Sequence, residues 1–187
     1  MARPKGSTSD AHERLLAAAG RGFRSGGYGG IGVDGLAKQA GLTSGAFYAY
    51  FGSKAEAFRQ AVRTGIADLA SGIRSFREAG GDWRGRFIDF YTTERVTCDI
   101  AESCALQSLT SDVARADRPT REDYTAGLEQ AISALADTAG AAERAKAIAL
   151  LALLSGGTAM ARAVSDPALA EEIVAAMRKA ATDPTAG

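Results

Sequence analysis

Apolar side chains recur every three or four positions along most of this chain, and that spacing is typical of amphipathic α-helices. The longest stripe follows Ser53 and places six apolar residues on one face: Phe58, Val62, Ile66, Leu69, Ile73 and Phe76. Shorter stripes predict a first helix to about Ser25, a helix after Asp82, one from about Ser103 to Arg115, and one after Asp117. No sustained alternation of apolar and polar residues indicates a strand, so the pattern predicts an all-α protein.

Two short helices joined by a tight turn are predicted within residues 32–51. Gly41 ends the first helix, because glycine readily adopts the left-handed backbone conformation that follows a helix. The hydroxyl of Thr43 or Ser44 can then cap the second helix by accepting a hydrogen bond from a first-turn amide. This arrangement is typical of a helix-turn-helix, although an ordinary αα-hairpin with a solvated face has the same spacing.

The second of these helices has two distinct faces. Phe47 and Phe51 are four residues apart and share the face that turns inward. Tyr48, Tyr50 and the hydroxyls of the first turn are left outside, and Lys54 follows the helix. Such polar groups can donate hydrogen bonds to phosphate oxygens and to base edges. A helix of this size also fits a major groove about 12 Å wide.

The residues of this segment resemble those of the tetracycline-repressor (TetR) family of bacterial transcriptional regulators. The resemblance rests on three runs: Leu36-Ala37-x-x-Ala40-Gly41-Leu42, Gly45-x-Phe47-Tyr48-x-x-Phe51 and Ser53-Lys54-x-x-x-x-Phe58. It covers the first third of the chain. Gly32 departs from the family, which usually has Thr or Ser there, so a hydroxyl that often caps the helix and contacts a phosphate is missing.

The resemblance implies a three-helix DNA-binding domain over residues 7–60 and a helical regulatory and dimerisation domain over 61–187. It also implies a ligand-responsive repressor that binds a palindromic operator as a dimer. Carried onto this sequence, with the basic residues of the first five positions added, it gives the following DNA-binding candidates: Arg3, Lys5, Thr43, Ser44, Gly45, Tyr48, Ala49, Tyr50 and Lys54.

The charge distribution agrees with a DNA-binding N-terminus. The chain has 22 basic and 22 acidic residues in total. Residues 1–60 hold 8 Lys and Arg against 4 Asp and Glu, and the remainder of the chain holds 14 against 18. A basic N-terminal third and an acidic remainder favour one end that faces nucleic acid.

The last two predicted helices are the most apolar. One spans about 145–163, and the other begins after Asp166-Pro167. A helix that is apolar on nearly all sides must be covered on all sides, either inside one chain or by a second copy. The family resemblance implies the second copy, in a homodimer built as a four-helix bundle. The interface candidates are Leu151, Leu154, Gly156, Ala159, Ile173 and Met177.

A small-molecule pocket in the second domain is also implied by the resemblance. Its candidate residues combine apolar walls with a few polar ends, as ligand pockets do, although plain core packing explains each of them equally well. They are Phe90, Tyr91, Tyr124, Met160 and Arg162.

Other functions find little support in the sequence. Gly27-x-Gly29-x-x-Gly32 matches a dinucleotide-binding pattern, but a helix rather than a strand precedes it. Cys98 and Cys104 have no accompanying cluster of Cys and His, so neither a metal nor a cofactor is expected, and inert thiols are favoured over a redox sensor. The single histidine, His12, has no catalytic partner residues near it in the sequence, and we expect it to be solvated or to face a phosphate.

A cytoplasmic transcription factor is the function that the sequence indicates. The longest apolar run, 147–154, is far shorter than the ~20 residues that span a bilayer, and no signal peptide is recognised. Two alternatives stay open: a helix-turn-helix architectural protein that takes no ligand, and a helical enzyme.

Overall fold

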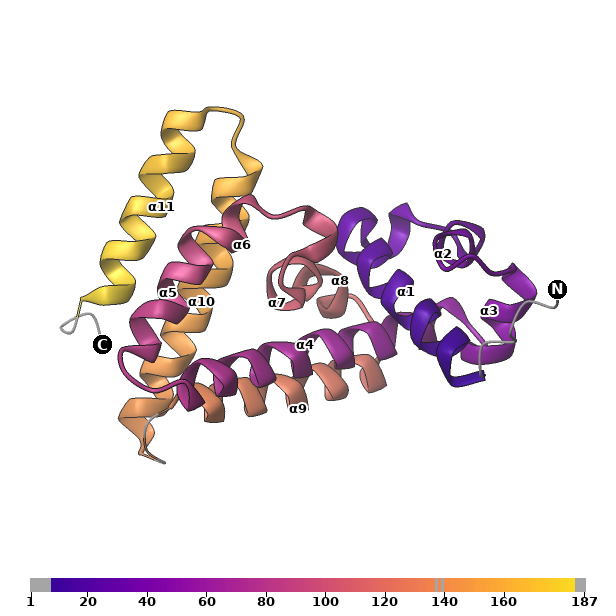
Figure 1. Cartoon of the computed structure of the whole chain (residues 1–187), viewed down its shortest axis with the longest axis horizontal. Coiled ribbons are helices and arrows are strands. Elements are labelled where there is room, and N and C mark those ends of the chain that lie inside the picture. Colours follow the sequence, from indigo (N-terminus) through magenta and orange to yellow (C-terminus); the bar gives the residue numbers. More distant parts are fainter. Residues whose placement is uncertain (1–7, 137, 139, 184–187) are drawn as a thin grey trace, which may run out of the picture.

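A computed structural model describes residues 8–136, 138 and 140–183, and these residues form helices and no strand (Figure 1). The prediction of an all-α protein is confirmed. The helices are α1 (Thr8–Gly30), α2 (Val33–Gln39), α3 (Ser44–Phe51), α4 (Lys54–Glu78), α5 (Trp83–Thr92), α6 (Glu94–Thr97), α7 (Ala105–Ser108), α8 (Thr110–Ala114), α9 (Arg118–Leu135), α10 (Ala141–Ala163) and α11 (Pro167–Thr182), with a 3-10 turn, η1 (Ile100–Glu102), before α7.

Several helices begin at polar side chains that cap the first turn. The Ser53 hydroxyl accepts a hydrogen bond from the Glu56 amide at 3.0 Å and starts α4. The carboxylates of Asp82, Asp117 and Asp166 do the same for α5, α9 and α11. Each cap satisfies a backbone donor that has no partner within the helix, which is why the helix starts were visible in the sequence.

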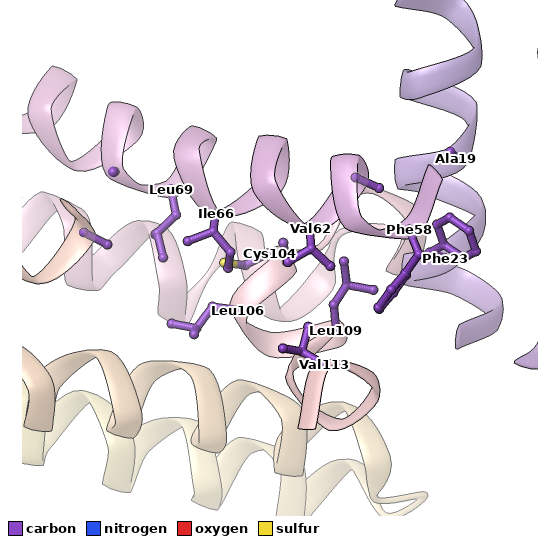
Figure 2. Packing of buried hydrophobic residues seen from close by; sticks show 14 of the residues in the cluster. Ala19, Phe23, Phe58, Val62, Ile66, Leu69, Cys104, Leu106, Leu109 and Val113 are labelled. Atoms are coloured by element: carbon purple, nitrogen blue, oxygen red, sulfur yellow. The ribbon is translucent and has the colours of Figure 1, made fainter. Parts of the chain in front are cut away.

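The long helix α4 connects the N-terminal helices to the rest of the protein (Figure 1). Its apolar stripe points into one continuous core, where Phe58 packs against Phe23 of α1, and Val62, Ile66 and Leu69 face the segment that contains α7 and α8 (Figure 2). Helix α9 lies along α4 (Figure 1). A Cβ added to Gly127 would stand 2.6 Å from Cγ2 of Ile66, so glycine lets these helices approach closely.

The first helix differs from the sequence prediction. It continues past Ser25 to Gly30, with a kink at Gly27, where φ is +66°. Glycine adopts this left-handed conformation without steric cost. The carboxylate of Asp112, from α8, accepts a hydrogen bond from the Tyr28 amide at 2.9 Å immediately after the kink. A contact from a distant part of the chain thus stabilises a bend that the glycine-rich sequence only permits.

The prediction of one helix from about Ser103 to Arg115 is wrong in its detail. The segment forms two short helices, α7 and α8, that meet at Leu109, whose backbone is near φ −108°, ψ −12°. Leu109 is fully buried. We attribute the break to tertiary packing, which turns Leu109 into the core (Figure 2). The short elements α6 and η1 carry no periodic pattern and were not predicted.

Three of the interface candidates on the two C-terminal helices are core residues of their own chain. Leu151, Leu154 and Met177 are buried in the core of their own chain, with exposed fractions of 4%, 1% and 3%. Met177 packs onto Gly157, where an added Cβ would lie 2.5 Å from the Met177 sulfur. The outer surface of α10 and α11 instead exposes Ile148, Met160 and Leu169.

Helix α10 also meets the length and composition of a membrane-spanning helix, the single one among the described residues to do so. Apolar core helices of soluble proteins meet the same criteria.

Candidate nucleic-acid interface

The geometry of α3 follows from a few local residues. Gly41 adopts φ +67° and allows the chain to leave α2. The Thr43 hydroxyl then accepts a hydrogen bond from the Ala46 amide at 3.2 Å and starts α3. The Ser44 hydroxyl donates a hydrogen bond to the carboxylate of Asp34, which lies on α2. The two helices are therefore fixed relative to each other on both sides of the turn.

The two faces of α3 are sharply different. Phe47 and Phe51 have exposed fractions of 0% and 4%, and their ring centroids are 5.0 Å apart. Tyr48 is 52% exposed, and Gly45 and Ala49 are exposed beside it. One face of the helix is therefore fixed in the core, while the other presents a phenol hydroxyl and small side chains to the outside.

Tyr50 does not belong to the face of Tyr48. It is half-buried, and its ring centroid is 5.7 Å from that of His12 on α1. His12 is also half-buried and lies 5.5 Å from the ring of Phe51. His12 is therefore only partly solvated, because the aromatic residues of α3 pack against this part of α1, and its contact with a phosphate stays a prediction.

Lys54, at the start of α4, lies over an aromatic ring. Its Nζ atom is 4.8 Å from the ring centroid of Tyr28, which itself packs edge-on against Phe58 at 5.1 Å. Such a cation–π contact orients the ammonium group at a partly exposed site. Tyr28 was missed by the sequence analysis, because a single tyrosine within a run of glycines carries no periodic signal.

Two candidates fall outside the described residues. These are Arg3 and Lys5.

An ion pair connects α4 to α9, the helix that lies beside it. The Arg59 guanidinium contacts the carboxylate of Glu56 at 2.8 Å and that of Asp123, on α9, at 3.1 Å. Hydrogen bonds from Arg59 and Gln60 lower the pKa of Glu56. On α1, Nε of Arg24 donates to the carbonyl of Ala101 at 2.6 Å, and burial lowers the pKa of this guanidinium. The N-terminal helices are therefore joined to the remainder of the chain through both α1 and α4.

The five pocket candidates do not line a single cavity. Phe90 and Tyr91 line a cavity of about 220 Å³ between α4 and α5, together with Arg24, Arg95 and Cys104. Tyr124 lines a second cavity of about 350 Å³ between α9 and α10.

Met160 and Arg162 line neither of these cavities. Met160 is 59% exposed, and Arg162 donates hydrogen bonds to the carbonyls of Arg95 and Val96, each at 3.1 Å. Neither side chain therefore shares one of these two cavities with Phe90, Tyr91 or Tyr124.

The cysteines are free thiols, with Cys98 half-buried and Cys104 buried. The Tyr91 hydroxyl donates a hydrogen bond to the Cys104 sulfur at 3.1 Å, and burial raises the pKa of this tyrosine. Among the residues with described positions, no group of three or more His, Cys, Asp or Glu side chains is placed to hold a metal ion.

Comparison with known proteins identifies the arrangement. Residues 15–61, which include α2 and α3, match the sequence profile of the bacterial regulatory proteins of the tetR family. The chain carries a TetR-type DNA-binding domain over these residues. It is therefore a DNA-binding transcriptional regulator, as the sequence predicted. Regulators of the TetR family are DNA-binding proteins rather than enzymes, in agreement with the sequence analysis.

Solved structures extend the similarity to the whole fold. NemR of E. coli in its reduced form shares 20% identity over 92% of this chain and 95% of its own, with a TM-score of 0.74. A TetR-family regulator from Agrobacterium tumefaciens shares 18% identity over 92% and 98%, with a TM-score of 0.71. The fatty acid degradation regulator FadR from Bacillus halodurans shares 15% identity over 98% of each chain, with a TM-score of 0.65. Among curated protein sequences, none matches significantly.

Proposed function

We propose that this regulator is a cytoplasmic, ligand-responsive repressor that binds a palindromic operator as a homodimer. In this proposal residues 7–60 form the DNA-binding domain and residues 61–187 the regulatory and dimerisation domain. The observation that carries the proposal is the outer face of α3, where Tyr48 is 52% exposed while Phe47 and Phe51 are buried behind it. The proposed DNA contacts are Thr43, Ser44, Gly45, Tyr48, Ala49 and Lys54, with Arg3 and Lys5 as a basic arm.

The proposed regulation depends on α4. Because α4 is one continuous helix from Lys54 to Glu78, its N-terminal end cannot move independently of its C-terminal end. A ligand that shifts α4 or the adjacent α9 would therefore alter the distance between the two α3 helices of a dimer. Two half-sites are read in register only when that distance matches about one turn of DNA, roughly 34–36 Å.

The experiment that tests this function is footprinting on the DNA upstream of the gene for this protein. We expect protection of two inverted half-sites whose centres are about one helical turn, or a small multiple of it, apart. Protection should weaken when the salt concentration rises, because phosphate contacts release counterions. Uniform coating of the DNA without a preferred site would contradict a sequence-specific repressor.

Lys54→Ala should weaken binding to operator and to random DNA by a similar factor. The ammonium group is proposed to contact a phosphate, which carries no sequence information. The slope of log K against log salt concentration should also fall by about one. Fluorescence anisotropy at several salt concentrations measures both effects, with the exposed Lys38→Ala on α2 as the matched control. A loss confined to the operator, with an unchanged slope, would instead assign Lys54 to base reading.

Met160→Glu and Leu169→Glu should each convert the dimer to monomers. Both side chains are exposed in the single chain, by 59% and 42%, so a charge there should hardly alter the fold of the monomer. In the proposed interface the same carboxylate would be buried without a partner. Sedimentation measures the oligomeric state, and operator affinity should fall with it. Ser133→Glu, at an exposed position of α9, is the control. A dimer that survives both interface changes would place the contact elsewhere.

A further inference from the structure

The cavity between α4 and α5 combines aromatic rings with two arginine side chains. Its volume is about 220 Å³. An apolar cavity of about 150 Å³ can hold benzene, so this one has room for a benzene ring with a short substituent. Phe76, Phe87 and Phe90 supply apolar surface to the lining, and Arg24 and Arg95 supply positive charge. A single small molecule can therefore contact both kinds of surface.

The two guanidinium groups have no carboxylate as a counter-ion. Nε of Arg24 donates a hydrogen bond to the carbonyl of Ala101, and Nη1 of Arg95 donates one to the carbonyl of Glu102, each at 2.6 Å. Within the part of the chain that the structure describes, neither arginine forms an ion pair. Both residues are half-buried, so water hydrates their charges only in part.

Two acidic residues, Asp68 and Glu102, also line the cavity, but their environment differs. Both are exposed, so their carboxylates keep their hydration. Burial lowers the pKa of Arg24, and this effect exceeds the opposite effect of the charges of Glu102 and Asp68. The lining therefore has a partly desolvated cation and well-hydrated anions. A bound anion would compensate the charge that lacks hydration, whereas a bound cation would add to it.

The end of the Arg24 side chain is open to a ligand. Among the described residues, the buried side-chain nitrogen and oxygen atoms without a partner are Nε of Arg95 and Oε1 of Gln107. Nη1 and Nη2 of Arg24 are not among these covered atoms, although neither donates a hydrogen bond to a described residue. Both nitrogens thus keep accessible surface and free N–H groups. A carboxylate binds such a pair through two parallel hydrogen bonds.

We infer that this cavity binds a small organic carboxylate, whose charged group accepts hydrogen bonds from the guanidinium of Arg24 and whose apolar part packs against the aromatic rings of the lining. The inference rests on the proposed function, because it identifies the chemical class of the effector. Arg24 lies on α1, in the proposed DNA-binding domain, whereas the aromatic rings lie on α4 and α5. The bound molecule would therefore contact both domains and fix α1 relative to the regulatory helices.

Calorimetry on the full chain without DNA, at about pH 7.5, tests the ligand class. The probes have the same number of non-hydrogen atoms in their side arm or one more: phenylacetate is an anion, 2-phenylethanol is neutral and 2-phenylethylamine is a cation. Phenylacetate should bind at least about tenfold more tightly than 2-phenylethanol, which is the effect of hydrogen bonds between charged groups. The amine should bind more weakly than the alcohol, because like charges repel. Equal affinities for phenylacetate and 2-phenylethanol, or a preference for the amine, would overturn the inference.

Arg24→Gln tests the residue that recognises the charge. The preference for phenylacetate over 2-phenylethanol should disappear, while the alcohol should keep its wild-type affinity because the aromatic lining is unchanged. Arg24→Lys keeps the positive charge and should show an intermediate preference. Arg21→Gln is the matched control, because Arg21 is also half-buried on α1 but lines a separate groove between α1 and α4. A full preference in Arg24→Gln would overturn the inference.

Two substitutions to leucine test the location. A Cβ added at Gly72, in the cavity lining, would have no neighbouring element within 4 Å, so Gly72→Leu can extend into the cavity and should abolish binding of phenylacetate. Ala17→Leu extends into the groove between α1 and α4, which Arg24 also lines, and should leave binding intact. Loss of binding in Ala17→Leu alone would place the ligand in that groove and overturn the inference. Footprinting of the wild type without any probe tests the proposed function separately, so the two failures are distinguishable.

Discussion

Replacing Phe47 by alanine should strongly destabilise the DNA-binding end of the chain. The Phe47 side chain is completely buried and packs against the ring of Phe51 at 5.0 Å. Truncating a buried phenylalanine removes its burial energy and leaves a cavity, at a cost of about 3–5 kcal/mol. Since the total stability of a domain is about 5–15 kcal/mol, this loss should lower the midpoint of thermal or urea unfolding substantially. Circular dichroism during the transition measures it.

Tyr48→Phe is the matched control on the opposite face of the same helix. It removes one hydroxyl from a side chain that is 52% exposed, so melting should hardly change. DNA affinity should still fall, by about 0.5–3 kcal/mol depending on whether the lost hydrogen bond reaches a charged phosphate. Early melting of Tyr48→Phe together with normal DNA binding, or full stability of Phe47→Ala, would show that the faces of α3 are assigned wrongly.

These face assignments were predictable because they depend on local signals. Gly41, the Thr43 cap and the spacing of Phe47 and Phe51 lie within a dozen residues, and each acts through its own backbone or the next helical turn. The caps at Asp82 and Asp166 are equally local. For such features the sequence contains both the cause and the partner, so the helix starts and the inward face of α3 follow from the sequence.

Features that depend on distant partners were not predictable in the same way. The bend at Gly27 is stabilised by Asp112, which is 84 positions from Tyr28 in the sequence. The break at Leu109 reflects the core that this side chain enters, not its helical propensity. Tyr50 likewise has a partner, His12, on another helix. Periodicity predicts that a helix has an inward face, but it cannot say which other elements cover that face.

Helix α10 shows most clearly what hydrophobic periodicity cannot predict. Its sequence is apolar on nearly every side, so periodicity could not separate residues that face the core from those that face outward. Leu151 and Leu154 were assigned to the dimer interface but are core residues of their own chain. Ile148 and Met160, on the same helix, are the ones left exposed. The same ambiguity explains the pocket candidates, which share a composition but line different surfaces.

Leu154→Glu should consequently abolish folding of the single chain, and this separates it from changes at the outer surface. Leu154 is 1% exposed, and a carboxylate there would be buried without a partner. We expect a loss of at least about 4 kcal/mol, comparable to the whole stability of a marginal domain. Circular dichroism should show no cooperative unfolding transition at neutral pH. Leu154→Met, which conserves volume, should cost less than about 1.5 kcal/mol and keep the transition.

The pH dependence shows whether the introduced charge is the cause. Burial raises the pKa of a carboxyl in the folded state above its unfolded value of about 4.3. The folded state then holds more protons than the unfolded state, so the stability of Leu154→Glu should rise as the pH is lowered from about 8 to about 5. Leu154→Gln has a similar shape without the titrating proton, and its stability relative to the wild type should not change over this range. A Leu154→Glu protein that melts like the wild type at pH 8 would show that position 154 faces solvent, and the packing of α10 against its own chain would have to be abandoned.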